Sequence, residues 1–308
     1  MKTMLWVSLI ASIWGASHVW VRLAAPVFGA GTVAWARLAI GAGTMLLWLR
    51  FFGHTRTSAI PFRTRLFHWI VVGALNGALP FLLFADASLH LPASYLSILN
   101  SLTPAFSALF SWVLLSEPLK IRAGFGLLLG FFGVVLIEEF GPVSFQDRRV
   151  LVALLEGVGA ALCYGLVGIY IKKRVPPTDP KTLVAGSFGT ASLMMLPVLA
   201  GGSLSDFTVI SSDAWRVALV SILLLGVLSS SLAFVMYYGL LEKVGPFRSS
   251  LVTQMIPVFG VLWGTLWLGE QVTPVMGLGA ALVLFSTVMI LRPVRPSERL
   301  TTQGDPSP

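Results

Sequence analysis

The sequence predicts an all-α integral membrane protein, with ten transmembrane helices arranged as two inverted five-helix repeats. Of its 308 residues, 56% are hydrophobic and only 11% are charged, a composition unlike that of a soluble domain. A hydrocarbon core of about 30 Å is crossed by about 20 helical residues. Ten apolar segments of roughly that length follow one another, at 3–24, 31–50, 66–86, 92–115, 119–138, 150–171, 182–201, 215–238, 246–268 and 274–292.

One stretch of the chain occurs twice, at 92–126 and at 245–279, with an offset of 153 residues. In each copy a long apolar segment contains a central proline, is followed by a glutamate, and leads into a Gly-rich apolar segment. The prolines are Pro104 and Pro257, and the glutamates are Glu117 and Glu270. The pattern predicts a proline-containing helix with an acidic residue after its end, once in each half of the chain.

A proline within a helix has no N–H to donate, so the carbonyl four residues earlier loses its partner. Asn100 and Thr253 stand four residues before the two prolines, and Gln254 follows Thr253. Asn76 and Pro80 repeat the spacing in the third segment. In lipid such a carbonyl must face protein or a water-filled cavity, so we expect Asn76, Asn100, Thr253 and Gln254 to border a cavity.

The repeat unit contains five helices, an odd number, so the second copy enters the membrane from the opposite side. Residues 1–138 form the first repeat and 150–292 the second, with an external connection at 139–149 and a disordered cytoplasmic tail at 293–308. Inverted repeats of this kind are typical of alternating-access transporters.

Positive charge is distributed unevenly between the two sets of connections. With the N-terminus inside, cytoplasmic segments carry Lys2, Arg50, Arg56, Arg63, Arg65, Lys120, Arg122, Lys172, Lys173, Arg174, Lys181, Lys243, Arg248, Arg292, Arg295 and Arg299. The external segments carry only Arg22, Arg148, Arg149 and Arg216. The positive-inside rule therefore places both termini in the cytoplasm, and the net charge of +8 is explained without a nucleic-acid partner.

Several polar and aromatic residues fall within the expected helices. Trp14 and His18 lie near one face of the first helix, and Arg37 lies inside the second. At an offset of 150 residues, Trp14-Gly15 corresponds to Tyr164-Gly165 in the sixth helix. We expect Trp14, His18, Arg37 and Tyr164 to line a central cavity. Trp267 and Tyr238, near helix ends, fit an interfacial aromatic belt instead.

These features resemble the drug/metabolite transporter (DMT) superfamily, EamA type. The resemblance rests on Trp14-Gly15, Arg37 and the paired proline–glutamate stretches, and it covers roughly residues 4–292. It implies ten helices and secondary transport of small metabolites, without one substrate. The second half has no clear counterpart of Arg37, and Gly245-Pro246 replaces Pro92-Ala93. The resemblance also implies binding residues that vary with substrate, so none is carried over to this sequence.

Ionisable residues inside a membrane helix are costly and mark functional sites. Glu156, within the sixth helix, is the candidate proton-coupling residue, with a structural ion pair to Arg37 or Arg149 as the alternative. Arg37 is suited to a substrate carboxylate, or else to a structural tether. His18 is the rival proton carrier. Glu117 and Glu270, after helix ends, favour gating or structural contacts over substrate binding.

Other classes of function are disfavoured. The sequence has no G-x-x-x-x-G-K-[ST] motif for direct use of ATP, and no H-E-x-x-H motif or Cys/His cluster for a metal, so we expect no cofactor, no metal and no enzyme activity. The expected function is secondary export of a small polar metabolite, such as an amino acid or derivative, across the cell (inner) membrane. Cationic drugs, nucleotide sugars or sugar phosphates are the alternative substrates, and a channel or an intramembrane enzyme is the alternative to transport. A proton or another ion would be the coupling partner.

Overall fold

The computed structural model describes all but a few short segments and the C-terminal tail. The described residues are 2–53, 60–87, 90–91, 93–138, 146–201, 212–269 and 271–291. Within these ranges the regular structure is entirely helical. Glu270, the predicted tail and most of the predicted external connection lie outside them.

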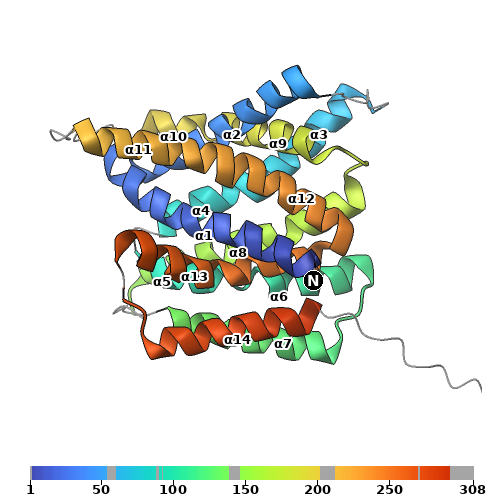
Figure 1. Cartoon of the computed structure of the whole chain (residues 1–308). Helices are drawn as coiled ribbons and strands as arrows, with labels where there is room; N and C mark the ends of the chain where they lie inside the picture. Colours follow the sequence, from blue (N-terminus) through green and yellow to red (C-terminus); the bar gives the residue numbers. More distant parts are fainter. Residues whose placement is uncertain are drawn as a thin grey trace, which may run out of the picture.

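The helices follow the expected segments closely (Figure 1). The first half contains α1 (Lys2–Phe28), α2 (Ala30–Phe52), α3 (Phe62–Gly73), the π-helical η1 (Ala74–Ala78), α4 (Leu79–Ala87), α5 (Ala93–Asn100), α6 (Thr103–Leu115) and α7 (Ile121–Ile137). The second half contains α8 (Arg148–Arg174), α9 (Pro180–Met194), α10 (Leu196–Gly201), α11 (Ser212–Leu224), the π-helical η2 (Leu225–Leu232), α12 (Ala233–Val244), α13 (Pro246–Leu268) and α14 (Pro274–Leu291).

Among the described residues, eight stretches are long and apolar enough to cross a membrane, and three of them, Phe62–Phe84, Tyr95–Leu115 and Ser212–Val244, each join consecutive elements. The fifth expected helix, α7, has 17 residues and falls just short of that length. The seventh is divided at Met195 into α9 and α10. The chain is therefore a multi-pass helical membrane protein, and the count of ten crossings remains a prediction.

The fourth expected helix departs from the sequence-based prediction. A continuous helix over 92–115 is wrong, because α5 ends at Asn100 and α6 begins at Thr103. Pro104 lies in the first turn of α6, where its missing N–H leaves no bond unmade. Pro257, by contrast, lies inside the continuous α13. The two copies of the repeated stretch thus accommodate their prolines differently.

Two π-helical segments widen the third and eighth expected helices. Asn76 lies in η1 and Ser229–Ser231 in η2, and Asn76 corresponds to Ser229 at the 153-residue offset. The segment η1 packs on α9, whereas η2 packs on α2. Single π-helical turns inside α-helices are often found at functional sites. Both segments are therefore candidates for parts of a functional site in the middle of the bundle.

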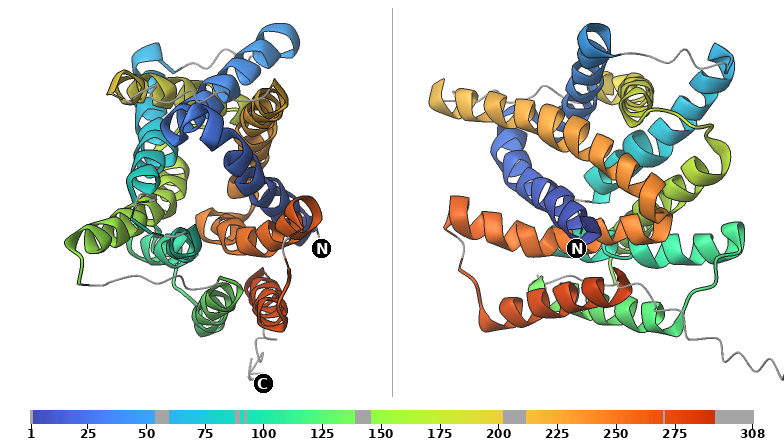
Figure 2. Two further views of the ribbon diagram at one scale, coloured as in Figure 1. Left: turned by 90° about the vertical axis from the view of Figure 1, so that its left-hand side faces the viewer. Right: turned by 45° about the vertical axis from the view of Figure 1, so that its right-hand side comes forward.

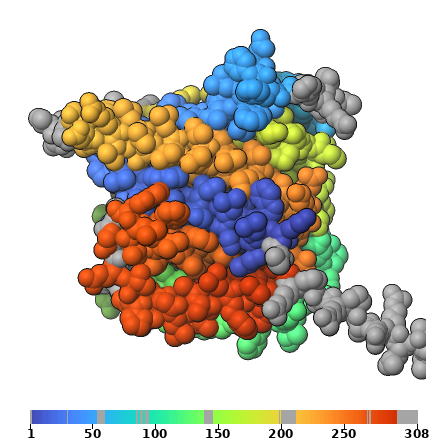
Figure 3. All heavy atoms as spheres, in the orientation of Figure 1, coloured from blue at the N-terminus to red at the C-terminus, as the bar shows by residue number. Residues whose placement is uncertain are grey.

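The long helices pack in corresponding pairs from the two halves. The helix α1 packs on α13, and α8 packs on α6. Figures 1 and 2 show α7 and α14 side by side along one edge of the bundle. On the face in Figure 3 the lower part is covered by α14, which exposes Leu278 and Phe285. Such apolar outer surface is what a lipid-facing helix requires.

Glycines allow the closest of these approaches. A Cβ added at Gly15 would lie 2.7 Å from the Cβ of Phe259 in α13. A Cβ added at Gly165 would lie at the same distance from the Cβ of Phe106 in α6. Gly15 and Phe259 therefore correspond in position and contact to Gly165 and Phe106, and both α1 and α8 depend on a residue without a side chain.

We expect Gly15→Ala to destabilise the protein by about 1–3 kcal/mol, the usual cost of overpacking a filled interior. The added methyl group would also lie 2.9 Å from the backbone nitrogen of Gly260, which has little freedom to move. Thermal unfolding in detergent measures the loss. The control is Gly239→Ala in α12, where an added Cβ meets nothing within 4 Å; equal effects of the two changes would contradict the packing argument.

Candidate functional site

Arg37, about two turns from the start of α2, is held by hydroxyl groups from η2. Its Nε donates to Ser230 Oγ at 3.1 Å, and its Nη2 donates to Ser229 Oγ at 3.0 Å. Its guanidinium carbon lies 4.8 Å from the centre of the Phe81 ring of α4. Three helical segments thus meet at one cation in the middle of the bundle.

No carboxylate among the described residues forms an ion pair with Arg37. Its two hydrogen bonds go to neutral hydroxyls, and Nη1 has no protein hydrogen-bond partner in the described part of the chain. A cation inside a membrane protein usually pairs with an anion or with backbone carbonyls. The Arg37 guanidinium therefore has spare donors and uncompensated charge, which an anionic ligand would satisfy.

Trp14 contacts η2, the segment that holds Arg37. Its indole Nε1 donates to the backbone carbonyl of Ser229 at 3.0 Å, and its side chain is buried. The indole packs against the Phe234 ring at a centroid distance of 4.9 Å and against Tyr237 at 5.4 Å. The predicted cavity residue is thus packed in the core, where it positions the η2 backbone beside Arg37.

His18 and Tyr164 both lie within electrostatic range of Arg37. The His18 side chain is exposed. Tyr164 is half-buried and stacks on Phe84 with ring centroids 6.4 Å apart. The structure therefore gathers three of the predicted site residues, His18, Arg37 and Tyr164, in one region.

A second polar centre surrounds η1. Asn76 Nδ2 donates to the Tyr238 hydroxyl at 2.9 Å, and both residues are buried. Tyr238 also interacts with Ser187 of α9, which takes the place of Arg37 at the 150-residue offset. The assignment of Tyr238 to an interfacial belt is wrong, because this tyrosine is 3% exposed. The sequence pattern gives no signal for the Asn76–Tyr238 hydrogen bond, because the two residues are 162 apart in the chain.

The remaining predicted cavity residues lie in α5 and α13. Asn100 is the last residue of α5, and its Oδ1 accepts a long hydrogen bond of 3.5 Å from Thr103 Oγ1. Thr253 Oγ1 donates to Ser250 O within its own helix. Gln254 is 1% exposed and packs against Gly130 of α7. Gln254 thus lies between helices, and its Oε1 has no hydrogen-bond partner among the described residues.

Glu156 lies where α8 packs on α4, beside Asp86 and within electrostatic range of His90. Its Oε2 is buried without a hydrogen-bond partner in the described part of the chain, and no ion pair to Arg37 or Arg149 is formed there. A pocket of about 370 Å³ opens next to it, lined by Asp86, His90, Asp147, Arg148, Arg149 and Val152.

At the other end of α8, Lys172 pairs with Glu117, the residue that follows α6. Lys173 Nζ adds a bond of 2.7 Å to the Leu114 carbonyl at the C-terminal end of α6. Glu117 therefore joins two helix ends, the kind of contact that a gate requires.

No group of three or more His, Cys, Asp or Glu suited to a metal occurs among the described residues.

We expect Tyr238→Phe to destabilise the protein by about 1–3 kcal/mol, because the change leaves the Asn76 amide donor buried without its acceptor. Chemical or thermal unfolding measures the effect. Tyr170→Phe is the control, since its bond to His68 Nδ1 is only partly buried and water can replace it. A loss for Tyr238→Phe no greater than for Tyr170→Phe would contradict a structural role for the η1 centre.

Comparison with known proteins identifies the family. The model of the EamA-like transporter family matches residues 1–138 and 151–292. The chain is 25% identical over 284 residues to the uncharacterized transporter YoaV of Bacillus subtilis (strain 168), covering 92% of this chain and 94% of that protein. It is 25% identical over 243 residues to Protein PecM of Dickeya dadantii (strain 3937), covering 76% of this chain and 79% of PecM.

The fold is also that of a known structure. One crystal structure superposes with a TM-score of 0.73 at 17% identity, over 94% of this chain and 96% of the other. At that identity the likeness concerns the fold alone. The family match, however, covers both halves of the sequence, and it confirms the resemblance drawn from Trp14-Gly15, Arg37 and the proline–glutamate stretches. The chain belongs to the EamA-like transporter family, within the drug/metabolite transporter superfamily.

Proposed function

We propose that the protein is a secondary active exporter of a small polar metabolite that carries a carboxylate, such as an amino acid or an amino acid derivative. The observation that carries the proposal is Arg37, a cation in the middle of the bundle with hydroxyl partners and no carboxylate partner among the described residues. Family membership and the transporter names of relatives support membrane transport in general.

The chemistry around Arg37 favours a carboxylate over the alternatives. A guanidinium binds a carboxylate through two parallel N–H···O bonds, which add both energy and geometric selectivity. A cationic drug would be repelled by Arg37, with no described carboxylate there to offset the charge. A sugar phosphate or nucleotide sugar also carries negative charge and is the second candidate. A single arginine is better matched to one carboxylate than to a diphosphate.

We infer that transport proceeds by alternating access between two inverted repeats, 1–138 and 150–292. The corresponding contacts of Gly15 with Phe259 and of Gly165 with Phe106 support this arrangement. So do the equivalent positions of η1 and η2. The positive-charge distribution favours cytoplasmic termini and an inner-membrane location. Rocking of one half against the other would expose the Arg37 region to each side in turn.

The paired glutamates act as gates in this scheme. Glu117 and Lys172 join the ends of α6 and α8 on the side assigned to the cytoplasm. The 153-residue offset relates Glu117 to Glu270, and the 150-residue offset relates Lys172 to Arg22. We propose that Glu270 has the corresponding gating role on the external side. Breaking one gate while the other forms would change access without altering the central site.

We expect Arg37→Gln to weaken binding of the carboxylate substrate by about tenfold to a hundredfold, which corresponds to the roughly 1.5–3 kcal/mol of a charge-assisted hydrogen bond. Arg37→Lys should retain part of the affinity, because it keeps the charge but loses the planar fork. A thermal-shift screen of amino acids and their amides identifies a ligand, and counterflow in liposomes then tests its transport.

Two comparisons decide this test. Arg50→Gln, a change at the end of α2, removes the same charge outside the centre and should leave affinity unchanged. An amino acid amide should bind far more weakly than its acid to the wild-type protein. Equal binding of acid and amide, or of wild type and Arg37→Gln, would contradict a carboxylate site.

We also propose that Glu156 carries the coupling proton, together with Asp86 at the α4–α8 contact. Glu156→Gln should abolish the response of net transport to a pH gradient while leaving substrate counterflow, because exchange needs no net proton movement. Both modes are measured in liposomes with and without the gradient. A full response in the mutant would transfer the role to His18 or to another ion. Loss of both modes in folded protein would indicate a binding role.

A further inference from the structure

A second pocket, of about 130 Å³, lies at the end of the bundle where α8 terminates. It is formed by the C-terminal part of α6, the connection to α7, and the first turns of α7 and α13. The pocket at Asp147–Arg149 lies at the opposite end of α8, about 40 Å away for a helix of 27 residues. The smaller pocket is therefore on the side to which the positive-inside rule assigns the cytoplasm.

Two helix N-termini converge on this pocket. The helix α7 begins at Ile121 after Lys120, and α13 begins at Pro246 after Gly245. Neither N-cap residue makes a side-chain capping bond, and neither first turn contains an acidic residue. The first turn of a helix presents N–H donors and the positive end of the helix dipole. Such ends bind anions, phosphate groups in particular.

Acidic side chains would stabilise two helix N-termini, but the charged side chains that line the pocket are mainly basic. Lys120, Arg122 and Arg248 all line it. Glu117 lines it as well, but its carboxylate is paired with Lys172. Apart from that pair, Lys120, Arg248 and two helix N-termini face the same small volume.

Ser111 supplies an independent indication that this pocket binds a ligand. It lines the pocket and is 3% exposed, and its Oγ has no hydrogen-bond partner among the described residues. Buried hydroxyls almost always have a partner, and one left without a partner costs about 1–3 kcal/mol. A phosphate oxygen in the pocket would accept the hydrogen bond that this hydroxyl otherwise lacks.

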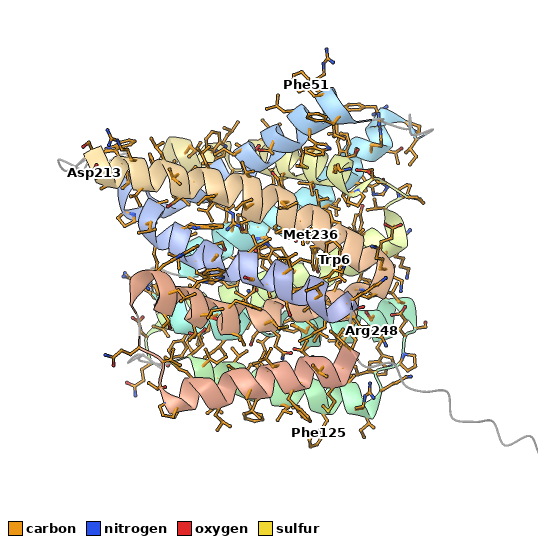
Figure 4. The ribbon with its side chains drawn as sticks, in the orientation of Figure 1. Trp6, Phe51, Phe125, Asp213, Met236 and Arg248 are labelled. Atoms are coloured by element: carbon orange, nitrogen blue, oxygen red, sulfur yellow. The ribbon has the colours of Figure 1, made fainter. Side chains whose placement is uncertain are left out.

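We propose that this pocket binds the phosphate of an anionic phospholipid from the cytoplasmic leaflet. The lining also contains apolar side chains, Leu119 and Ile290. On the outer surface of α7, Ile121 is 92% exposed and Phe125 is 70% exposed. Figure 4 shows Arg248 toward the end of the bundle where α13 begins, and Phe125 on the outer surface of α7. Acyl chains would lie along α7 while the headgroup occupies the pocket.

A basic pocket beside exposed apolar side chains favours a lipid over a soluble phosphate compound as the ligand. Basic pockets at the ends of membrane helices on the cytoplasmic side suit anionic headgroups, and the apolar residues beside this one would have no partner in a free metabolite. The site is separate from the Arg37 centre, so its test does not depend on the proposed substrate.

The experiment measures retention of phosphatidylglycerol by the full-length protein with native mass spectrometry, after transfer from vesicles of phosphatidylglycerol and phosphatidylcholine. The wild type should retain phosphatidylglycerol in preference to phosphatidylcholine. Lys120→Gln/Arg248→Gln should reduce the retained fraction at least fivefold. Ser111→Ala, which changes no charge, should reduce it about threefold or more. Arg50→Gln, which removes a cation that does not line the pocket, should have no effect.

The outcomes separate the proposal from its rivals. Equal losses for Arg50→Gln and for Lys120→Gln/Arg248→Gln would show that general surface charge attracts the lipid, and would overturn the proposal. Unchanged retention in Ser111→Ala would overturn it also, because the pocket would then not hold the phosphate. Displacement of phosphatidylglycerol by millimolar inorganic phosphate would assign the site to a soluble anion instead and would overturn the proposal. Thermal unfolding of each variant confirms that the comparison is made between folded proteins.

Discussion

Every backbone polar group inside the hydrocarbon core must face a hydrogen-bond partner in the protein or a water-filled cavity, and the middle of this bundle is arranged around that constraint. At the π-helical segment η2, side chains form hydrogen bonds with backbone carbonyls. The Ser229 carbonyl accepts from Trp14 Nε1. Ser231 Oγ lies at 2.9 Å from the Gly41 carbonyl of α2 and 3.0 Å from the Gly226 carbonyl of η2. The same segment presents Ser229 and Ser230 to Arg37, so one irregular turn both anchors its neighbours and forms the centre.

The two halves use equivalent positions for different chemistry. Arg37 and Ser229 in one centre correspond by sequence offset to Ser187 and Asn76 in the other. One centre is therefore cationic, and the other is a neutral network through Tyr238. In the proposed mechanism, the repeat would allow access to change from side to side, and the single charge of Arg37 would give the substrate one orientation. The carboxylate proposal follows from this asymmetry, because only the Arg37 centre has spare charged donors.

Helix positions and family membership could be predicted from the sequence because apolar length and paired motifs are local signals. Segment 246–268 matches α13 residue for residue. The interruption at Ser101 and Leu102 could not be predicted, because Pro104 is equally compatible with a kinked helix and with a new first turn. The roles of Trp14 and Tyr238 were also hidden, since each is fixed by a partner more than 150 residues away. The positions of His18, Arg37 and Tyr164 were anticipated because charge and aromaticity inside apolar helices are conspicuous.

The proposed alternating access requires the region around Arg37 to become accessible from each side of the membrane in turn. Tyr164 lies in that region, and Cys163 is the protein's single cysteine. A Cys163→Ala/Tyr164→Cys variant, oriented in membrane vesicles, allows labelling by a membrane-impermeant thiol reagent from either side. The account predicts labelling from both sides, with saturating substrate protecting the cysteine in both experiments. Labelling from one side only, with and without substrate, would contradict alternating access at this site.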